Sequence, residues 1–145
     1  MPEISIVMLN YNSFEDLIEC YNNLKLQKDV KLKYIIVDNN SKIECVNQLK
    51  EWQESLSNSV IVKELDNFTK TDEIDIFFYF NKNNSGYSAG NNIGVKISEK
   101  LGINSILISN PDMRYNDNNY CLELYKTLNG NTQIKISSSR IIGLD

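Results

Sequence analysis

Asn110, Pro111 and Asp112 are the residues whose types and order most suggest chemistry, because they closely follow a run of large apolar residues at 106–108, with only Ser109 between. Such a run is typical of a strand buried on both faces of a parallel sheet. Proline fixes its own backbone and disfavours the helical region for the preceding residue, so the chain should leave the sheet extended. A carboxylate at the carboxyl end of such a strand lies where open α/β sheets bind ligands. The alternative is a polar turn that only ends the strand, since such turns are common.

Three further polar clusters follow predicted strands or begin predicted helices, at residues 10–12, 38–41 and 84–92. Tyr11 is compatible with an aromatic side chain that stacks on a base, or with an ordinary surface or capping residue. Asp38 is compatible with a ligand-binding carboxylate, or with an acid that stabilises the start of a helix. Each cluster alone leaves both interpretations open.

Gly86, Gly90 and Gly94 are spaced by four residues and would share one face of a helix. A sheet, a ligand phosphate or another backbone can approach such a face closely, and the spacing alone favours helix packing. The neighbouring Asn91 and Asn92 would point partly towards the polar edge of the sheet. The stretch is not a dinucleotide-binding fingerprint, which needs glycines two apart after the first strand, and no G-K-[ST] phosphate loop occurs.

The chain of 145 residues contains no histidine, which excludes Ser-His-Asp and Cys-His catalysis, His-ligated zinc and imidazole proton transfer. Its net charge of -4 argues against nucleic acid or an anionic membrane as a main partner. Cys20, Cys45 and Cys121 are far apart and suit free thiols in a reducing compartment. No apolar run is long enough to span a membrane, and the amino terminus lacks a basic signal-peptide region, so we expect a cytoplasmic protein.

Hydrophobic periodicity predicts one domain in which strands and helices alternate. We expect strands at 4–9, 32–37, 60–62, 74–80 and 103–108, with late strands at 134–136 and 141–142, and helices near 14–24, 46–56, 89–101 and 120–128. Ser13 and Ser41 should cap the first two helices, paired with Asp16 and Glu44. Two strands joined through a helix form a right-handed βαβ unit, so the polar ends of the first two strands should share one edge.

The four polar clusters thus fall at strand ends or helix starts of a single predicted sheet. A ring of amides, carboxylates and one aromatic side chain at this edge would suit a nucleotide. Asp112 would then hold the divalent cation that bridges the phosphates of that nucleotide.

In order and spacing, the segments 4–12, 37–41, 84–94 and 109–112 resemble glycosyltransferase family 2, and most closely its rhamnosyltransferase-like branch. The resemblance implies a GT-A fold, a Rossmann-like and mostly parallel sheet flanked by helices, which binds a nucleotide-diphosphate sugar with Mg²⁺ or Mn²⁺. By position it implies that Leu9 and Tyr11 line the base pocket and that Asp38 accepts a hydrogen bond from a pyrimidine N–H. It also places three residues towards the ribose and diphosphate: Gly86, Asn91 and Asn92.

The sequence departs from the family pattern at the D-x-D position, where Asn110 replaces the first acid. The resemblance therefore implies Asp112 as the metal ligand, with Asn110 contacting ribose or water. Family members are usually considerably longer, and their second half carries the acceptor pocket and the catalytic acid. We therefore expect residues 1–145 to form a single, truncated nucleotide-sugar-binding domain without an identifiable catalytic base. Such a domain should form homo-oligomers through the apolar surface that the missing half would cover.

The leading hypothesis is the donor-binding half of an inverting, metal-dependent glycosyltransferase. It would transfer a sugar from a UDP- or dTDP-sugar to a glycan, a lipid-linked acceptor or another hydroxyl, in the cytoplasm or peripherally at the inner face of the membrane. The alternative is a non-catalytic sugar-nucleotide-binding module with the same fold. A nucleotidyltransferase would need a glycine-rich basic loop after the first strand, which the sequence lacks.

Overall fold

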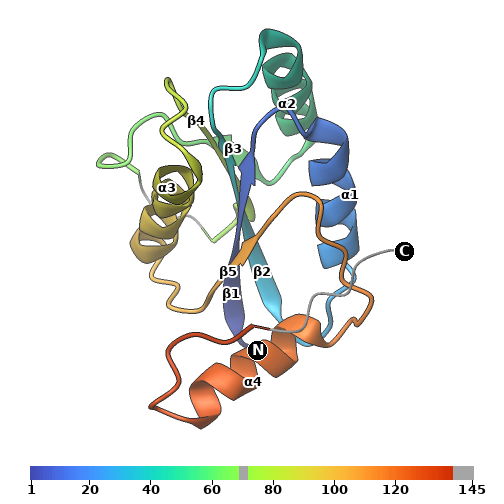
Figure 1. Ribbon diagram of the computed structural model, residues 1–145, viewed down its shortest axis with the longest axis vertical. Coiled ribbons are helices and arrows are strands. Elements are labelled where there is room, and N and C mark those ends of the chain that lie inside the picture. Colours follow the sequence, from blue (N-terminus) through green and yellow to red (C-terminus); the bar gives the residue numbers. More distant parts are fainter. Residues whose placement is uncertain (69–71, 139–145) are drawn as a thin grey trace.

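Strands and helices alternate along most of the chain in the computed structural model, which describes residues 1–68 and 72–138 (Figure 1). The strands are β1 (Glu3–Asn10), β2 (Lys31–Asp38), β3 (Ser59–Ile61), β4 (Ile76–Phe80) and β5 (Ile106–Ser109). The helices are α1 (Phe14–Leu24), α2 (Ile43–Ser55), α3 (Tyr87–Lys100) and α4 (Tyr120–Gly130). None of the helices in the described residues is long and apolar enough to cross a membrane.

The five strands form one sheet in the order β3-β4-β2-β1-β5, and every pairing is parallel. The predicted α/β fold with a mostly parallel sheet is therefore confirmed. In the register of the sheet, Asn10 pairs with Asp38, and Asp38 pairs with Phe80. Met8 pairs with Ser109 on the other side of β1. The polar segments that follow β1, β2, β4 and β5 consequently share one edge, as the βαβ argument predicts.

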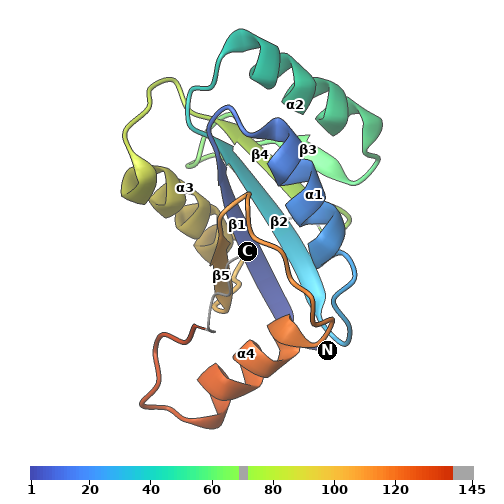
Figure 2. The ribbon, with the colours of Figure 1, turned by 45° about the vertical axis from the view of Figure 1, so that its right-hand side comes forward.

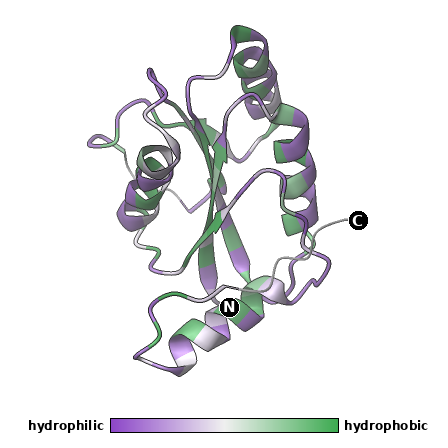
Figure 3. Ribbon diagram, in the orientation of Figure 1, coloured by the Kyte–Doolittle hydropathy of each residue, from purple (hydrophilic) through white to green (hydrophobic). Residues whose placement is uncertain are grey.

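Helices cover both faces of the sheet, with α1 and α2 on one side and α3 on the other (Figures 1 and 2). The side chains of β1 alternate between these two layers, as the pleat of a strand requires. Ile6 and Met8 belong to the core cluster that includes Leu17 of α1, and Val7 belongs to the cluster that includes Ile97 of α3. The strands are accordingly rich in hydrophobic residues along their length (Figure 3), which is typical of a sheet buried on both faces.

Two glycines of α3 allow this helix to lie directly against β1. A Cβ atom added at Gly94 would lie 2.3 Å from Cγ1 of Val7, and one added at Gly90 would lie 2.4 Å from Cδ1 of Leu9. Both positions therefore serve helix–sheet packing rather than the approach of a phosphate. Gly86 is different, because it precedes the helix with a φ of 89° and no atom lies within 4 Å of its added Cβ. The expectation that all three glycines share a helical face is wrong for Gly86.

Several expectations about the ends of elements are also corrected. The described residues 134–136 do not form a strand, and the expected strand at 141–142 lies outside the described residues. Ser13 immediately precedes α1 but makes no side-chain capping bond; its hydroxyl donates to the carbonyl of Tyr11 instead. The residue that precedes α2 is Lys42 rather than Ser41.

A buried lysine organises the opposite, amino-terminal edge of the sheet. The side chain of Lys33 on β2 is fully buried, and its ammonium group donates to the carbonyls of Asp72 and Ile74 and to Oδ1 of Asp75 at 2.8 Å. Burial alone would raise the pKa of Asp75, but hydrogen bonds from Lys33 and Asn58 outweigh it and hold this pKa below its ordinary value of 3.8. A buried ammonium group needs such partners, so Lys33 fixes residues 72–75 where β4 begins.

The glycine packing predicts a stability difference between two Gly→Ala variants. Gly94→Ala should destabilise the fold by about 1–3 kcal/mol, less a helix-propensity gain of up to about 1 kcal/mol, because the stiff and buried Val7 cannot move away. Gly130→Ala, at the end of α4 with no atom within 4 Å, should be neutral or stabilising. Urea unfolding measures both, and equal effects would contradict the close approach of α3 to β1.

The Lys33–Asp75 pair predicts a pH dependence of stability. The folded-state pKa of Asp75 is depressed, so its stabilisation is present above the unfolded value and is lost as pH falls through the folded one. Asp75→Asn should therefore cost stability near neutral pH, and the difference from the wild type should shrink towards about pH 3. Asp66→Asn, whose parent side chain is 99% exposed, is the control and should differ little from the wild type at any pH. A constant difference for Asp75→Asn in urea unfolding across this range would contradict the assignment.

Candidate donor-binding site

A buried carboxylate joins the ends of the two central strands. Asp38 at the end of β2 is 2% exposed, and it accepts hydrogen bonds from Nδ2 of Asn10 at 2.9 Å, from the hydroxyl of Ser41 at 2.6 Å and from the backbone N–H of Ser41 at 3.0 Å. Asn10 lies at the end of β1 and also donates to the Ser41 hydroxyl at 3.2 Å. A buried carboxylate is costly unless such donors surround it. The network therefore fixes the segments that follow β1 and β2 relative to each other.

Asn12 adds a second connection between the same two segments. Its backbone N–H donates to the hydroxyl of Ser41 at 2.9 Å, and its Oδ1 accepts a hydrogen bond from the backbone N–H of Lys42 at 2.7 Å. Asn12 has a φ of 54°, in the left-handed region that asparagine tolerates better than most residues. Asn12 thus holds Lys42, the residue that precedes α2, while Ser41, the expected cap, binds Asp38.

A chain of side-chain amides continues this edge towards α3. Nδ2 of Asn81 donates to Oδ1 of Asn39 at 3.3 Å, and Nδ2 of Asn39 donates to Oδ1 of Asn84 at 2.9 Å and to the carbonyl of Gly86 at 3.3 Å. Oδ1 of Asn84 also accepts a hydrogen bond from the N–H of Gly86 at 3.0 Å. The turn that leads into α3 is consequently held by neutral amide groups from the segments that follow β2 and β4.

Above these networks lies a shallow pocket of about 340 Å³. It is lined by residues from the ends of β1, β2 and β5 and from the start of α3: Leu9, Tyr11, Ser13, Asn39, Asn84, Tyr87, Asn110 and Pro111. Two aromatic side chains, Tyr11 at 53% and Tyr87 at 57% exposure, are open to solvent at this pocket. The described residues that line it include no lysine or arginine, so the pocket offers hydrogen bonds and aromatic surface but no positive charge.

Tyr87 and Asn110 connect the two sides of this pocket. The hydroxyl of Tyr87 at the start of α3 donates to Oδ1 of Asn110 after β5 at 2.9 Å. This bond uses the amide oxygen of Asn110, so its NH₂ group remains to donate to a ligand. Asn110 is thereby oriented as a hydrogen-bond donor, which differs from the role of an acid at the same position.

Asp112 is exposed and follows Pro111, which lines the pocket. No group of three or more His, Cys, Asp or Glu side chains able to hold a metal occurs in residues 1–68 and 72–138. A single carboxylate still fits Mg²⁺ or Mn²⁺, because such ions are usually held through one or two carboxylates together with waters and substrate phosphates. Asp112 therefore suits a cation that a bound diphosphate would help to hold.

The structure brings together some of the residues that the sequence suggests. Leu9, Tyr11 and Asn110 line the pocket, and Asp38 lies in the hydrogen-bond network at the same edge. Asn92 is exposed but outside the pocket lining.

Asn91 differs from expectation, because it is 4% exposed and its Nδ2 donates within the helix to the carbonyl of Tyr87 at 3.1 Å. Five lining residues received no individual role from the sequence, although all but Ser13 lie within the predicted polar clusters or the 110–112 corner: Ser13, Asn39, Asn84, Tyr87 and Pro111. An aromatic residue directly after the glycine that precedes a helix was the available signal for Tyr87.

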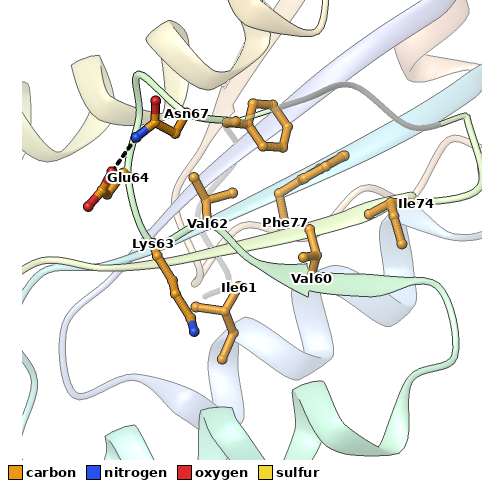
Figure 4. A pocket seen from close by; sticks show the side chains of 9 residues that line it. Val60, Ile61, Val62, Lys63, Glu64, Asn67, Ile74 and Phe77 are labelled. Atoms are coloured by element: carbon orange, nitrogen blue, oxygen red, sulfur yellow. Dashed lines mark hydrogen bonds between the residues drawn. The ribbon is translucent and has the colours of Figure 1, made fainter.

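A larger cavity of about 450 Å³ lies beside β3 (Figure 4). Its walls are mostly apolar and include Val60, Val62, Phe68 and Phe77. It contains none of the residues that the four polar clusters supply. The smaller pocket at the carboxyl edge is therefore the better candidate for chemistry, since ligands of open parallel sheets bind at that edge.

The sequence matches the model of the family described as "Glycosyl transferase family 2" over residues 5–136. The chain belongs to this family. The match spans all four polar clusters and the whole of the described sheet after its first residues. The recognition of family 2 from the sequence is therefore confirmed.

Relatives of known description agree with the assignment. The chain is 29% identical over 143 residues to the low-salt glycan biosynthesis hexosyltransferase Agl10 of Haloferax volcanii, covering 98% of this chain and 38% of Agl10. The mannosyltransferase PcManGT of Pyrobaculum calidifontis, solved with GDP-Man and Mn²⁺, has a TM-score of 0.63 at 14% identity, with 86% of this chain and 32% of that one covered. The 1–349 portion of S. aureus TarS with UDP-GlcNAc has a TM-score of 0.59 at 16% identity, with 86% and 30% covered. These structural likenesses establish the GT-A type of fold, and the chain spans about a third of the length of these proteins.

The network around Asp38 predicts the effect of removing one hydroxyl. Ser41→Ala removes one of the three donors to the buried Asp38 carboxylate and leaves the Asn12 N–H without its partner, so it should destabilise the fold by about 1–3 kcal/mol. Ser55→Ala is the matched control, because the exposed Ser55 hydroxyl bonds only to a carbonyl in its own helix, and its effect should stay within about 0.5 kcal/mol. Urea unfolding compares the two, and a Ser41→Ala value as small as the control would refute a supporting role for this network.

Proposed function

We propose that this chain forms the donor-binding part of a metal-dependent, inverting glycosyltransferase that uses a pyrimidine-diphosphate sugar, UDP- or dTDP-linked. The observation that carries the proposal is the pocket at the carboxyl edge, where two exposed tyrosines, several amides and the Asn110–Asp112 corner meet in a family 2 chain. The acceptor would be a glycan, a lipid-linked saccharide or another hydroxyl compound.

The charge of the pocket supports dependence on a metal ion. A sugar-nucleotide diphosphate is an anion, and the described residues lining the pocket offer no cationic side chain to balance it. Asp112, next to the pocket, would hold Mg²⁺ or Mn²⁺, and the bound ion would neutralise charge on the departing diphosphate. Asp112 would therefore contribute to nucleotide binding only when the cation is present.

The remaining residues receive roles from their positions. Tyr11, on the open side of the pocket, would stack on the base, and Leu9 would provide an apolar contact below it. Asn110 would donate its NH₂ group to a ribose or phosphate oxygen, since Tyr87 occupies its amide oxygen. Asp38 would accept a base N–H only through a lone pair that Asn10 and Ser41 leave unused. Two further residues, Gly86 and Asn92, would face the ribose and diphosphate, whereas the burial of Asn91 favours a role inside α3.

The nucleotide of the sugar donor can be tested by comparing the binding of pyrimidine and purine diphosphates. The names of the relatives include a hexosyltransferase, a mannosyltransferase bound to GDP-Man and a protein bound to UDP-GlcNAc. We favour a pyrimidine because the pocket is shallow and small, and the likeness to the rhamnosyltransferase branch supports a dTDP-linked sugar. GDP belongs in the same titration series as the purine alternative.

A non-catalytic nucleotide-sugar-binding module is the second candidate. It is favoured by one observation, namely that the described residues lining the pocket include no carboxylate able to deprotonate an acceptor hydroxyl. Assays of sugar transfer and of donor hydrolysis by this chain separate the two candidates, because only the enzyme releases free nucleoside diphosphate.

Calorimetric titration with UDP, dTDP and GDP, with and without Mn²⁺, tests the proposed site. Asp112→Asn should weaken UDP binding in Mn²⁺ by about tenfold or more, equivalent to about 1.4 kcal/mol, and leave metal-free binding unchanged. Tyr11→Ala should weaken the free energy of UDP binding by about 1–3 kcal/mol with and without Mn²⁺, because base stacking does not depend on the metal.

Asp29→Asn serves as the control, since it removes the same charge from an exposed turn at the other edge of the sheet. A wild-type chain that binds none of the three nucleotides would refute the proposed function. An Asp112→Asn variant with wild-type affinity in Mn²⁺ would remove Asp112 as the metal ligand.

A further inference from the structure

Arg114 joins the corner that carries Asp112 to helix α1. One terminal nitrogen of its guanidinium donates to the carbonyls of Pro111 and Met113, at 3.0 and 2.9 Å. The other donates to Oδ1 of Asp16 and Oε2 of Glu19 on α1, at 3.2 and 2.6 Å. Arg114 therefore binds the backbone on both sides of Asp112 and also binds two carboxylates of helix α1.

The chemistry of this contact suits a fixed geometry. A planar guanidinium presents its donors in a rigid fork, and bonds to carboxylates are stronger than those between neutral groups. The hydrogen bond from Arg114, together with its positive charge, lowers the pKa of Glu19 below its ordinary value of 4.5. Two bonds to carbonyls and two to carboxylates use most of the donors of this guanidinium. Little of it remains free to bind a diphosphate directly.

Other contacts hold the same corner and leave Asp112 between them. The N–H of Met113 donates to the carbonyl of Asn110 at 3.1 Å, which closes a tight turn around residues 111 and 112. The backbone N–H of Tyr115 donates to Oδ1 of Asn23, also on α1. On the other side, the Tyr87 hydroxyl binds Asn110 from α3. The turn is therefore anchored to one helix on each face of the sheet, while the carboxylate of Asp112 stays exposed.

We propose that Arg114 is a positioning residue, which fixes the turn at 110–113 so that the Asp112 carboxylate faces the metal and diphosphate of the donor. The inference rests on the proposed function, and it adds a residue outside the pocket lining. It explains how a site with one acid can still hold a cation, because that acid is oriented before the ligand arrives and little ordering cost remains on binding.

A double-mutant cycle tests the coupling between Arg114 and Asp112. Arg114→Met should weaken Mn²⁺-dependent UDP binding by about tenfold to a hundredfold and leave metal-free UDP binding unchanged. Arg114→Lys should recover little of the lost Mn²⁺-dependent UDP affinity, because an ammonium group cannot bridge four acceptors in this arrangement. In the Asp112→Asn background, Arg114→Met should cause almost no additional loss. Lys126→Met, which removes a positive charge from an exposed pair on α4, is the control and should bind like the wild type.

A second measurement needs no nucleotide. Hydrogen exchange at the Met113 amide should accelerate by about tenfold or more in Arg114→Met, while amides in the centre of β1 keep their protection. Equal losses of UDP affinity with and without Mn²⁺ would show that Arg114 acts only through general stability. Additive losses of affinity in the double-mutant cycle would show the same, and either result would overturn the proposal. Unchanged exchange at Met113 would overturn it as well. If the wild type binds no nucleotide, the proposed function fails, and the exchange measurement still decides whether Arg114 orders the turn.

Discussion

A buried carboxylate with its donors is the interaction on which this edge of the molecule depends. Asp38 is almost inaccessible to water, so its charge is tolerated only because Asn10 and Ser41 surround it. These donors come from the end of β1 and from the segment after β2, and the two strands are adjacent in the sheet but far apart in sequence. Satisfying one carboxylate therefore also sets the relative positions of two loops, including the left-handed Asn12 that binds the backbone of Lys42 before α2. The candidate pocket lies above this arrangement.

Buried polar groups are hydrogen-bonded in different ways at the two edges of the sheet. At the amino-terminal edge, the ammonium group of Lys33 is enclosed by carbonyls and by Asp75. At the carboxyl edge, amides bind one another and keep exposed groups on top, with Tyr11 and Tyr87 facing solvent. The carboxyl edge therefore combines a rigid hydrogen-bonded base with exposed polar and aromatic groups, which is what a ligand site requires.

The neutrality of the pocket connects the binding site with the turn after β5. Under the proposed function, a diphosphate placed among amides and phenols would lack a counter-charge, so a cation held by Asp112 would be its natural complement. That requirement in turn gives importance to the groups that hold the turn, namely Tyr87 from α3 and Arg114 between the turn and α1. The site is therefore best regarded as a turn supported from both faces of the sheet, with the carboxylate as its exposed end.

The sequence by itself determined the α/β class, the order of the strands along the chain, the shared edge of the polar segments and the membership of family 2. Periodicity and turn residues encode these features among near neighbours, so Ile106–Ile108 and the glycines at 90 and 94 could be interpreted without coordinates. Side-chain partners were decided only by the tertiary structure. Ser41 has the residue type of a helix cap, yet it binds Asp38 because folding brings a buried charge within reach. Tyr87 forms a hydrogen bond with Asn110, which is 23 residues away in sequence, and Arg114 forms one with Glu19, which is 95 residues away. Such pairings depend on how the layers pack, and no local pattern specifies them.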